Sequence, residues 1–148
     1  MPRSILVKNG LKAIETLLED YRRAVYAYNS LISGTGYYLK PTHVVTRRLE
    51  DGTRLRYIYI GRYWWRLSYV SRRGGKGGVK WRYIGKEKPA ALKDYPDPPE
   101  PPLAGLRFAL LGGDDILVPW DVYERFKWLF KGYKAVEWPP RARDPGSE

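Results

Sequence analysis

Arginine and lysine are the side chains of this sequence whose chemistry is most evident, and they are concentrated in one segment. The chain of 148 residues has 27 Lys and Arg against 16 Asp and Glu, a net charge of +11. Residues 37–88 hold 14 of these cations and three acidic residues, while residues 1–36 and 89–148 carry net charges of +2 and −2. Nine of the 14 are arginine, whose guanidinium pairs bidentately with phosphate and stacks on bases. The distribution predicts an anionic partner that docks on the middle of the chain.

Side chains that could perform catalysis are few. The sequence has no cysteine and a single histidine, His43, at the start of a predicted strand, where a structural role is expected. Asp114 and Asp115 could bind a hard cation, but they follow two glycines in a turn, which gives them a structural task. Residues 74–78 are glycine-rich with one lysine, yet they lack the P-loop pattern and join two predicted strands. We therefore predict a protein that is not an enzyme and that needs no cofactor or metal.

The first element that positions these residues is a predicted helix. Apolar residues recur at alternating spacings of three and four, the period of one helix face: Leu11, Ile14, Leu18, Tyr21, Val25, Tyr28 and Ile32. Gly34 and Gly36 end the pattern. Two interpretations stay open. The stripe either packs on the protein's own sheet or forms a self-associating coiled coil, which would give a homo-oligomer.

The basic segment itself predicts antiparallel strands at residues 44–49, 54–60, 63–71 and 79–85. The first pair flanks Asp51-Gly52, a hairpin signal, and the second pair flanks the glycine-rich stretch. Successive side chains of a strand point to opposite faces, so the pattern divides this sheet into two sets. One set is aromatic and apolar: Leu55, Tyr57, Tyr59, Tyr63, Trp65, Leu67, Tyr69, Val79, Trp81 and Tyr83. We expect the helix to cover it.

The opposite set is mainly cationic and is expected to face solvent as the nucleic-acid-binding surface. Its arginines would contact phosphate, and Trp64, together with Tyr37 and Tyr38 nearby, would offer stacking surfaces for unpaired bases. The predicted binding residues are Arg47, Arg54, Arg56, Trp64, Arg66, Arg72, Arg73, Lys76, Lys80, Arg82 and Lys86.

Beyond the basic segment, six prolines in residues 89–105 predict an extended linker. It is either a ligand for an aromatic groove of a partner or a spacer wrapped over the protein's own surface. Residues 106–138 predict a small ββα-β cap, with a helix from Pro119 to Gly132, and residues 139–148 a polar tail. The predicted fold is α+β: a helix on a four-stranded antiparallel sheet in residues 1–88, then the linker and the cap.

Residues 63–86 resemble a known DNA-binding element. The stretches YVSRRGGK (residues 69–76) and VKWRYIGK (residues 79–86) are similar to the strand pairs of arm-type DNA-binding domains in tyrosine recombinases and related mobile-element proteins. In that family a three-stranded sheet enters the major groove. The resemblance implies a DNA-binding mode for part of the segment, namely Arg66, Arg72, Arg73, Lys80 and Arg82. No recombinase catalytic set is matched.

Composition also bears on the source and the class of protein. The chain has no glutamine, two asparagines and 12 prolines, as expected of a hyperthermophilic and archaeal origin. No signal peptide or membrane-spanning run is recognisable, so a cytoplasmic protein without a membrane role is expected. The leading hypothesis is a structural RNA-binding, ribosome-associated protein with rRNA and neighbouring ribosomal proteins as partners. The alternatives are a DNA-binding protein of viral, chromatin or mobile-element origin, and an assembly protein that uses the heptads of the helix.

Overall fold

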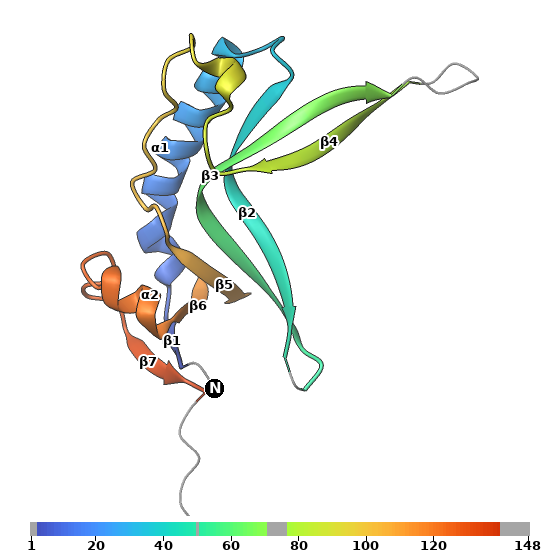
Figure 1. Ribbon diagram of the computed structural model, residues 1–148. Helices are drawn as coiled ribbons and strands as arrows, with labels where there is room; N and C mark the ends of the chain where they lie inside the picture. The colour runs from blue at the N-terminus through green and yellow to red at the C-terminus, as the bar shows by residue number, and fades with distance from the viewer. Residues whose placement is uncertain (1–2, 50, 71–76, 140–148) are drawn as a thin grey trace, which may run out of the picture. The chain divides into compact units, whose positions relative to one another are not determined.

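The computed structural model describes residues 3–49, 51–70 and 77–139, apart from the side chain of Val70. Its elements (Figure 1) follow in the order β1 (Ser4–Val7), α1 (Gly10–Leu31), β2 (Tyr37–Arg48), β3 (Arg54–Val70), β4 (Gly78–Gly85), the 3-10 turn η1 (Ala90–Leu92), β5 (Arg107–Gly112), β6 (Asp115–Pro119), α2 (Trp120–Arg125) and β7 (Ala135–Trp138). The α+β class and the long N-terminal helix are confirmed. None of the helices in the described ranges combines the length and apolar character needed to cross a bilayer.

The sheet is larger than predicted. Within the described residues, seven strands pair in the order β2-β3-β5-β6-β1-β7, with β4 also paired to β3. The predicted four-stranded sheet with a separate cap is therefore wrong, because β5, β6 and β7 belong to this same sheet. The helix expected up to Gly132 also ends early, at Arg125. The unpredicted strand β1 pairs antiparallel with both β6 and β7. Four residues are too short for a periodic signal, and only pairing partners more than a hundred residues away make them a strand.

The chain forms two compact units. The first consists of Met1–Thr16, Val44–Tyr59 and Gly105–Glu148, and the second of Leu17–His43 and Ile60–Ala104. Three elements, α1, β2 and β3, contribute residues to both units. The basic segment of the sequence is thus divided between them, and each unit buries apolar side chains of its own.

In the first unit, the start of α1 is fixed by close packing. A Cβ atom on Gly10 would lie 2.7 Å from a side-chain carbon of Ile116 and 2.9 Å from one of Val7, so only glycine fits. The backbone N–H of Asn9 donates a hydrogen bond to the Asp115 carboxylate at 2.9 Å. The turn before β6 is therefore tied to the helix start, which agrees with the structural task predicted for its carboxylates.

In the second unit, the apolar stripe of α1 packs on the protein's own sheet. Five stripe residues of this unit are buried: Leu18, Tyr21, Val25, Tyr28 and Ile32. The ring of Tyr28 meets Trp64 of β3 edge-on, with centroids 6.1 Å apart. Of the two interpretations of the stripe, packing within the chain is thus confirmed.

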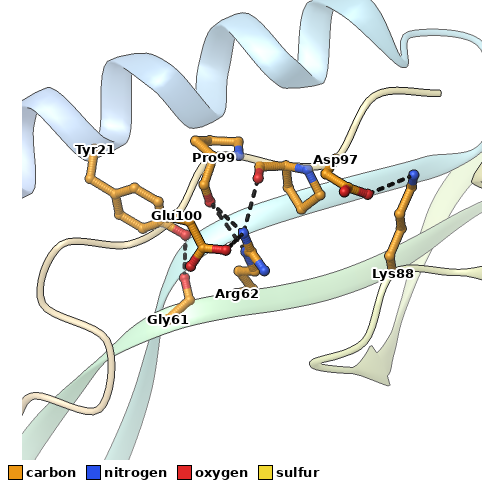
Figure 2. A network of polar contacts seen from close by, with 8 residues as sticks. Tyr21, Gly61, Arg62, Lys88, Asp97, Pro99 and Glu100 are labelled. Atoms are coloured by element: carbon orange, nitrogen blue, oxygen red, sulfur yellow. Dashed lines mark hydrogen bonds and ion pairs between the residues drawn. The ribbon is translucent and has the colours of Figure 1, made fainter.

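Within the second unit, the proline-rich segment is held by hydrogen bonds and ion pairs (Figure 2). The Arg62 guanidinium donates hydrogen bonds to the carbonyl oxygens of Pro98, at 2.9 Å, and Pro99, at 3.1 Å. The hydroxyl of Tyr28 donates to the carbonyl of Pro96 at 2.8 Å. Two ion pairs add to these contacts: Arg62 with Glu100 at 3.0 Å and Lys88 with Asp97 at 3.2 Å. A spacer wrapped over the protein's own surface is therefore the correct interpretation for residues 96–100.

Tyr21 makes the folded state sensitive to alkaline pH. Its buried hydroxyl donates to the Gly61 carbonyl at 2.6 Å, and burial raises the pKa of Tyr21 to about 12. In the unfolded chain the phenol titrates near pH 10, so the unfolded state loses this proton first. The contribution of Tyr21 to the free energy of unfolding is fully present below about pH 10, and roughly 2 kcal/mol of it is lost as pH rises toward 12.

We expect Tyr21→Phe to lower the free energy of unfolding at pH 7 by about 1 kcal/mol, through loss of the hydrogen bond. The variant should then lose less stability than the wild type between pH 9 and pH 11, a window set by the same raised pKa. Urea unfolding of both proteins across this range measures the difference. Parallel pH profiles would contradict the assignment.

Candidate nucleic-acid interface

The C-terminal part of β3 pairs with the whole of β4 in the second unit, and this strand pair is here called the ribbon. Its register pairs Trp65 with Tyr83 and continues to Val70 opposite Gly78. Every β4 residue before Gly85 is exposed, so the strand is open to solvent on both faces. Figure 1 shows the ribbon extending away from α1. A hairpin of this kind gains little stability by itself, which makes its aromatic and charged side chains candidates for contacts outside the chain.

One face of the ribbon, here called the cationic face, consists of Arg66, Lys80 and Arg82. Arg66 lies directly opposite Arg82, and Ser68 lies opposite Lys80. Among the described residues, none of these three cations has a carboxylate within ion-pair distance. Like charges directly opposite each other destabilise a strand pair, and no carboxylate within the described part of the chain offsets the repulsion between Arg66 and Arg82.

Arg66 is held in position by an aromatic neighbour. Its guanidinium carbon lies 5.5 Å from the centroid of the Tyr37 ring, and one of its nitrogens donates to the Tyr37 hydroxyl at 3.3 Å. Both contacts leave guanidinium N–H groups without a partner among the described residues, and the side chain remains exposed. A guanidinium oriented by a ring and still open to solvent can pair with phosphate at low entropic cost.

The other face of the ribbon, here called the aromatic face, consists of Trp65, Tyr69, Trp81 and Tyr83. Tyr69 is 88% exposed, and Trp81 and Tyr83 are 43% and 40% exposed. The Lys40 ammonium of β2 lies 4.6 Å from the ring centroid of Trp65 and 5.0 Å from that of Trp81. This face therefore combines rings that have exposed surface with a cation fixed beside them.

The aromatic face continues into a stack around the only histidine. The ring of His43 stacks on Tyr63 at 5.2 Å and on Tyr83 at 5.6 Å between centroids. The Lys86 ammonium lies 5.9 Å from the Tyr63 ring centroid. These ring contacts agree with the packing role predicted for His43 and place Lys86, one of the predicted binding residues, at the end of the aromatic stack.

The predicted assignment of faces is wrong in part in the second unit, although Arg66, Lys80 and Arg82 are exposed as predicted. Trp64 is 0% exposed and Ile60 is also buried, so α1 covers the side of β3 that was expected to be open. On the side expected to be covered, Tyr69, Trp81 and Tyr83 are exposed, although Tyr63 is buried as expected. In the first unit the prediction agrees with the structure, since Leu55 is buried while Arg54 and Arg56 are exposed. The buried side of β3 therefore changes along the strand, which alternation alone cannot reveal.

One predicted binding residue is excluded by this burial. Trp64 has no exposed surface, so it cannot stack on a base in this structure, and its indole N–H has no hydrogen-bond partner among the described residues. Its role is to fill the interior beneath α1. Of the predicted set, the second unit brings together Arg66, Lys80 and Arg82 on the cationic face, with Lys86 following β4.

The remaining predicted residues lie elsewhere. Arg47, Arg54 and Arg56 are exposed residues of the first unit. Among them Arg47 donates to the Tyr59 hydroxyl at 3.1 Å and lies 5.6 Å from the Tyr57 ring centroid. Arg72, Arg73 and Lys76 fall outside the described residues.

Sequence reasoning missed Trp81 and Tyr83 as binding candidates because it treated alternating aromatics as core, and it did not select Lys40 from the cations of the basic segment. A signal for their exposure was present. Strand β4 follows a glycine-rich stretch and alternates aromatic with cationic residues. Its cationic side has little apolar surface to bury, so the strand is expected to lie at the surface of the protein.

No known protein family, curated protein or solved structure matches this chain. Within residues 3–49, 51–70 and 77–139, no group of three or more His, Asp or Glu side chains is placed to hold a metal ion. A functional assignment therefore depends on the geometry and charge of the ribbon.

Proposed function

We propose that this is a non-catalytic nucleic-acid-binding protein that contacts the phosphate backbone through the cationic face of the β3–β4 ribbon. The observation that carries the proposal is the opposed pair Arg66 and Arg82, with Lys80 beside them, on an exposed ribbon without a neighbouring carboxylate among the described residues. A polyanion relieves the repulsion between these cations and releases its own condensed counterions on binding. Further phosphate contacts would come from other predicted residues: Arg47, Arg54, Arg56, Arg72, Arg73, Lys76 and Lys86.

RNA is the nucleic acid that we favour. Exposed rings such as Trp81 and Tyr83 suit unpaired bases, which are accessible in RNA loops and single strands but not inside a duplex. A structural role on ribosomal RNA, in the cytoplasm of a hyperthermophilic archaeon, is the context in which we place the protein. Duplex DNA is the second candidate, supported by a different observation. The major groove admits a two-stranded ribbon, and β4, which pairs with the end of β3, is exposed at every residue before Gly85.

Binding to rRNA, to a single-stranded oligonucleotide and to duplex DNA, measured over a salt series, tests the proposal. If about six phosphates are contacted, log K should fall with log salt at a slope near −5 on duplex DNA and near −4 on single strands. We expect rRNA and single strands to bind more tightly than the duplex at equal salt. An assembly protein would show almost no slope, and that result would overturn the proposal.

A further inference from the structure

A hollow of about 780 Å³ lies beside the ribbon in the second unit. Four tyrosines contribute to its lining: Tyr26 of α1, Tyr37 and Tyr38 of β2, and Tyr69 of β3. The volume is within the range of sites that hold small organic groups. We propose that this tyrosine hollow binds an unpaired base of a single-stranded nucleic acid. The inference rests on the proposed function and adds that the protein prefers single strands to duplexes.

Two of the four rings of the hollow are largely exposed, while Tyr37 and Tyr38 are half-buried. Tyr69 is 88% and Tyr26 52% exposed, and their hydroxyls, like that of Tyr38, form no hydrogen bond with the described residues. Exposed aromatic rings are costly to leave in water and provide faces on which any base can stack. The hydroxyls remain available to the polar edge of a base.

Part of the lining of the hollow is the turn between α1 and β2. Gly34 and Gly36, between α1 and β2, have φ angles of 88° and 85°, which favour glycine. A Cβ atom at Gly34 would meet nothing within 4 Å, so space is open above the backbone there. Asn29 also lines the hollow, but its side chain is occupied by hydrogen bonds to the N–H and C=O of Leu39, both at 2.8 Å. Its task is to hold β2 against α1.

Two cations lie next to tyrosines of the hollow, and they would meet the phosphates that flank a bound base. Arg66 borders it through its contacts with Tyr37. A second hollow of about 450 Å³ shares Tyr26 and Tyr38 with the first and is lined by Lys40. No acidic side chain lines the larger hollow, and Glu19, which lines the smaller one, is ion-paired with Arg22 at 2.8 Å. This charge pattern suits a nucleotide with a phosphate on each side and not an acidic or neutral peptide.

The test uses the double variant Tyr26→Ala/Tyr69→Ala, because both side chains are largely exposed and alanine favours the helix at position 26. A single-stranded oligonucleotide that contains 2-aminopurine, and the duplex formed with its complement, are titrated into the full-length protein. We expect stacking in the hollow to quench the fluorescence of the single strand. The variant should bind the single strand about tenfold or more weakly, with little change in duplex affinity or in the salt slope.

Tyr95→Ala is the matched control, since Tyr95 is an exposed tyrosine of the same unit outside the hollow. It should bind both ligands like the wild type. Unchanged single-strand affinity in the double variant, or equal losses on both ligands, would overturn the tyrosine hollow as a base site and leave the proposed function standing. If the wild-type protein binds neither ligand, both the hollow and the proposed function are overturned.

Discussion

Replacing Arg66, Lys80 and Arg82 together with glutamate is expected to weaken nucleic-acid binding severely and to leave the thermal unfolding midpoint within a few degrees of the wild type. The three cations form one exposed face and lack ion pairs with the described residues, so the fold loses no ion pair, only the exposed contacts of Arg66 with Tyr37. Substitutions at such positions usually change stability by less than about 0.5 kcal/mol each. The loss of three phosphate contacts should make the salt slope on duplex DNA shallower by about three.

A matched control distinguishes the effect of losing the cationic face from the effect of a lower net charge. Lys93, Lys131 and Lys134 are exposed and are not in ion pairs among the described residues. Their triple replacement by glutamate gives the same change of net charge. This control should keep most of the affinity and most of the salt slope. Equal losses in the two triple variants would mean that binding follows overall charge, and unfolding of the first variant would mean that the face has a structural role.

The helix stripe shows what periodicity can predict. The spacing from Ile14 to Ile32 identified a helix and its buried side, and those stripe residues are buried in the structure. Local spacing was sufficient because all these contacts are made by one continuous face, whatever it packs on. The presence of the main strands was predictable for the same reason. It was not predictable that the strands expected at residues 54–60 and 63–71 form one continuous strand, β3, which runs through Gly61, where the sequence suggested a break.

Which side of a strand is buried is decided by partners that are distant in the sequence. Along β3, Leu55 is buried together with Ala109 and Leu117, while Trp64 is buried beside Tyr28 of α1. Alternation sorts side chains into two sets but does not say which set faces the interior. The cations of the candidate site were predictable from composition. The exposure of the aromatic face was not, because tryptophan and tyrosine are usually counted as core residues.

Trp64→Ala is expected to cost about 3–5 kcal/mol of stability, the range for removing a large aromatic side chain from a packed interior. Trp64 is fully buried beneath α1, whereas Trp81 on the aromatic face is 43% exposed. For a chain of this size the loss corresponds to a fall of the order of 10 °C in the unfolding midpoint. Trp81→Ala should change the midpoint far less and should weaken single-strand binding, since it removes a ring from the aromatic face.

Trp64→Phe distinguishes loss of volume from loss of a polar contact. The indole N–H of Trp64 has no hydrogen-bond partner among the described residues, so phenylalanine removes no hydrogen bond and leaves most of the apolar volume in place. We expect it to recover more than half of the stability lost in Trp64→Ala. Calorimetry of the wild type and the three tryptophan variants measures the order. A larger loss from Trp81→Ala than from Trp64→Ala would show that the aromatic face, and not the Trp64 side, is the interior of the second unit, and the binding surface would then have to lie on the side of β3 that carries Trp64.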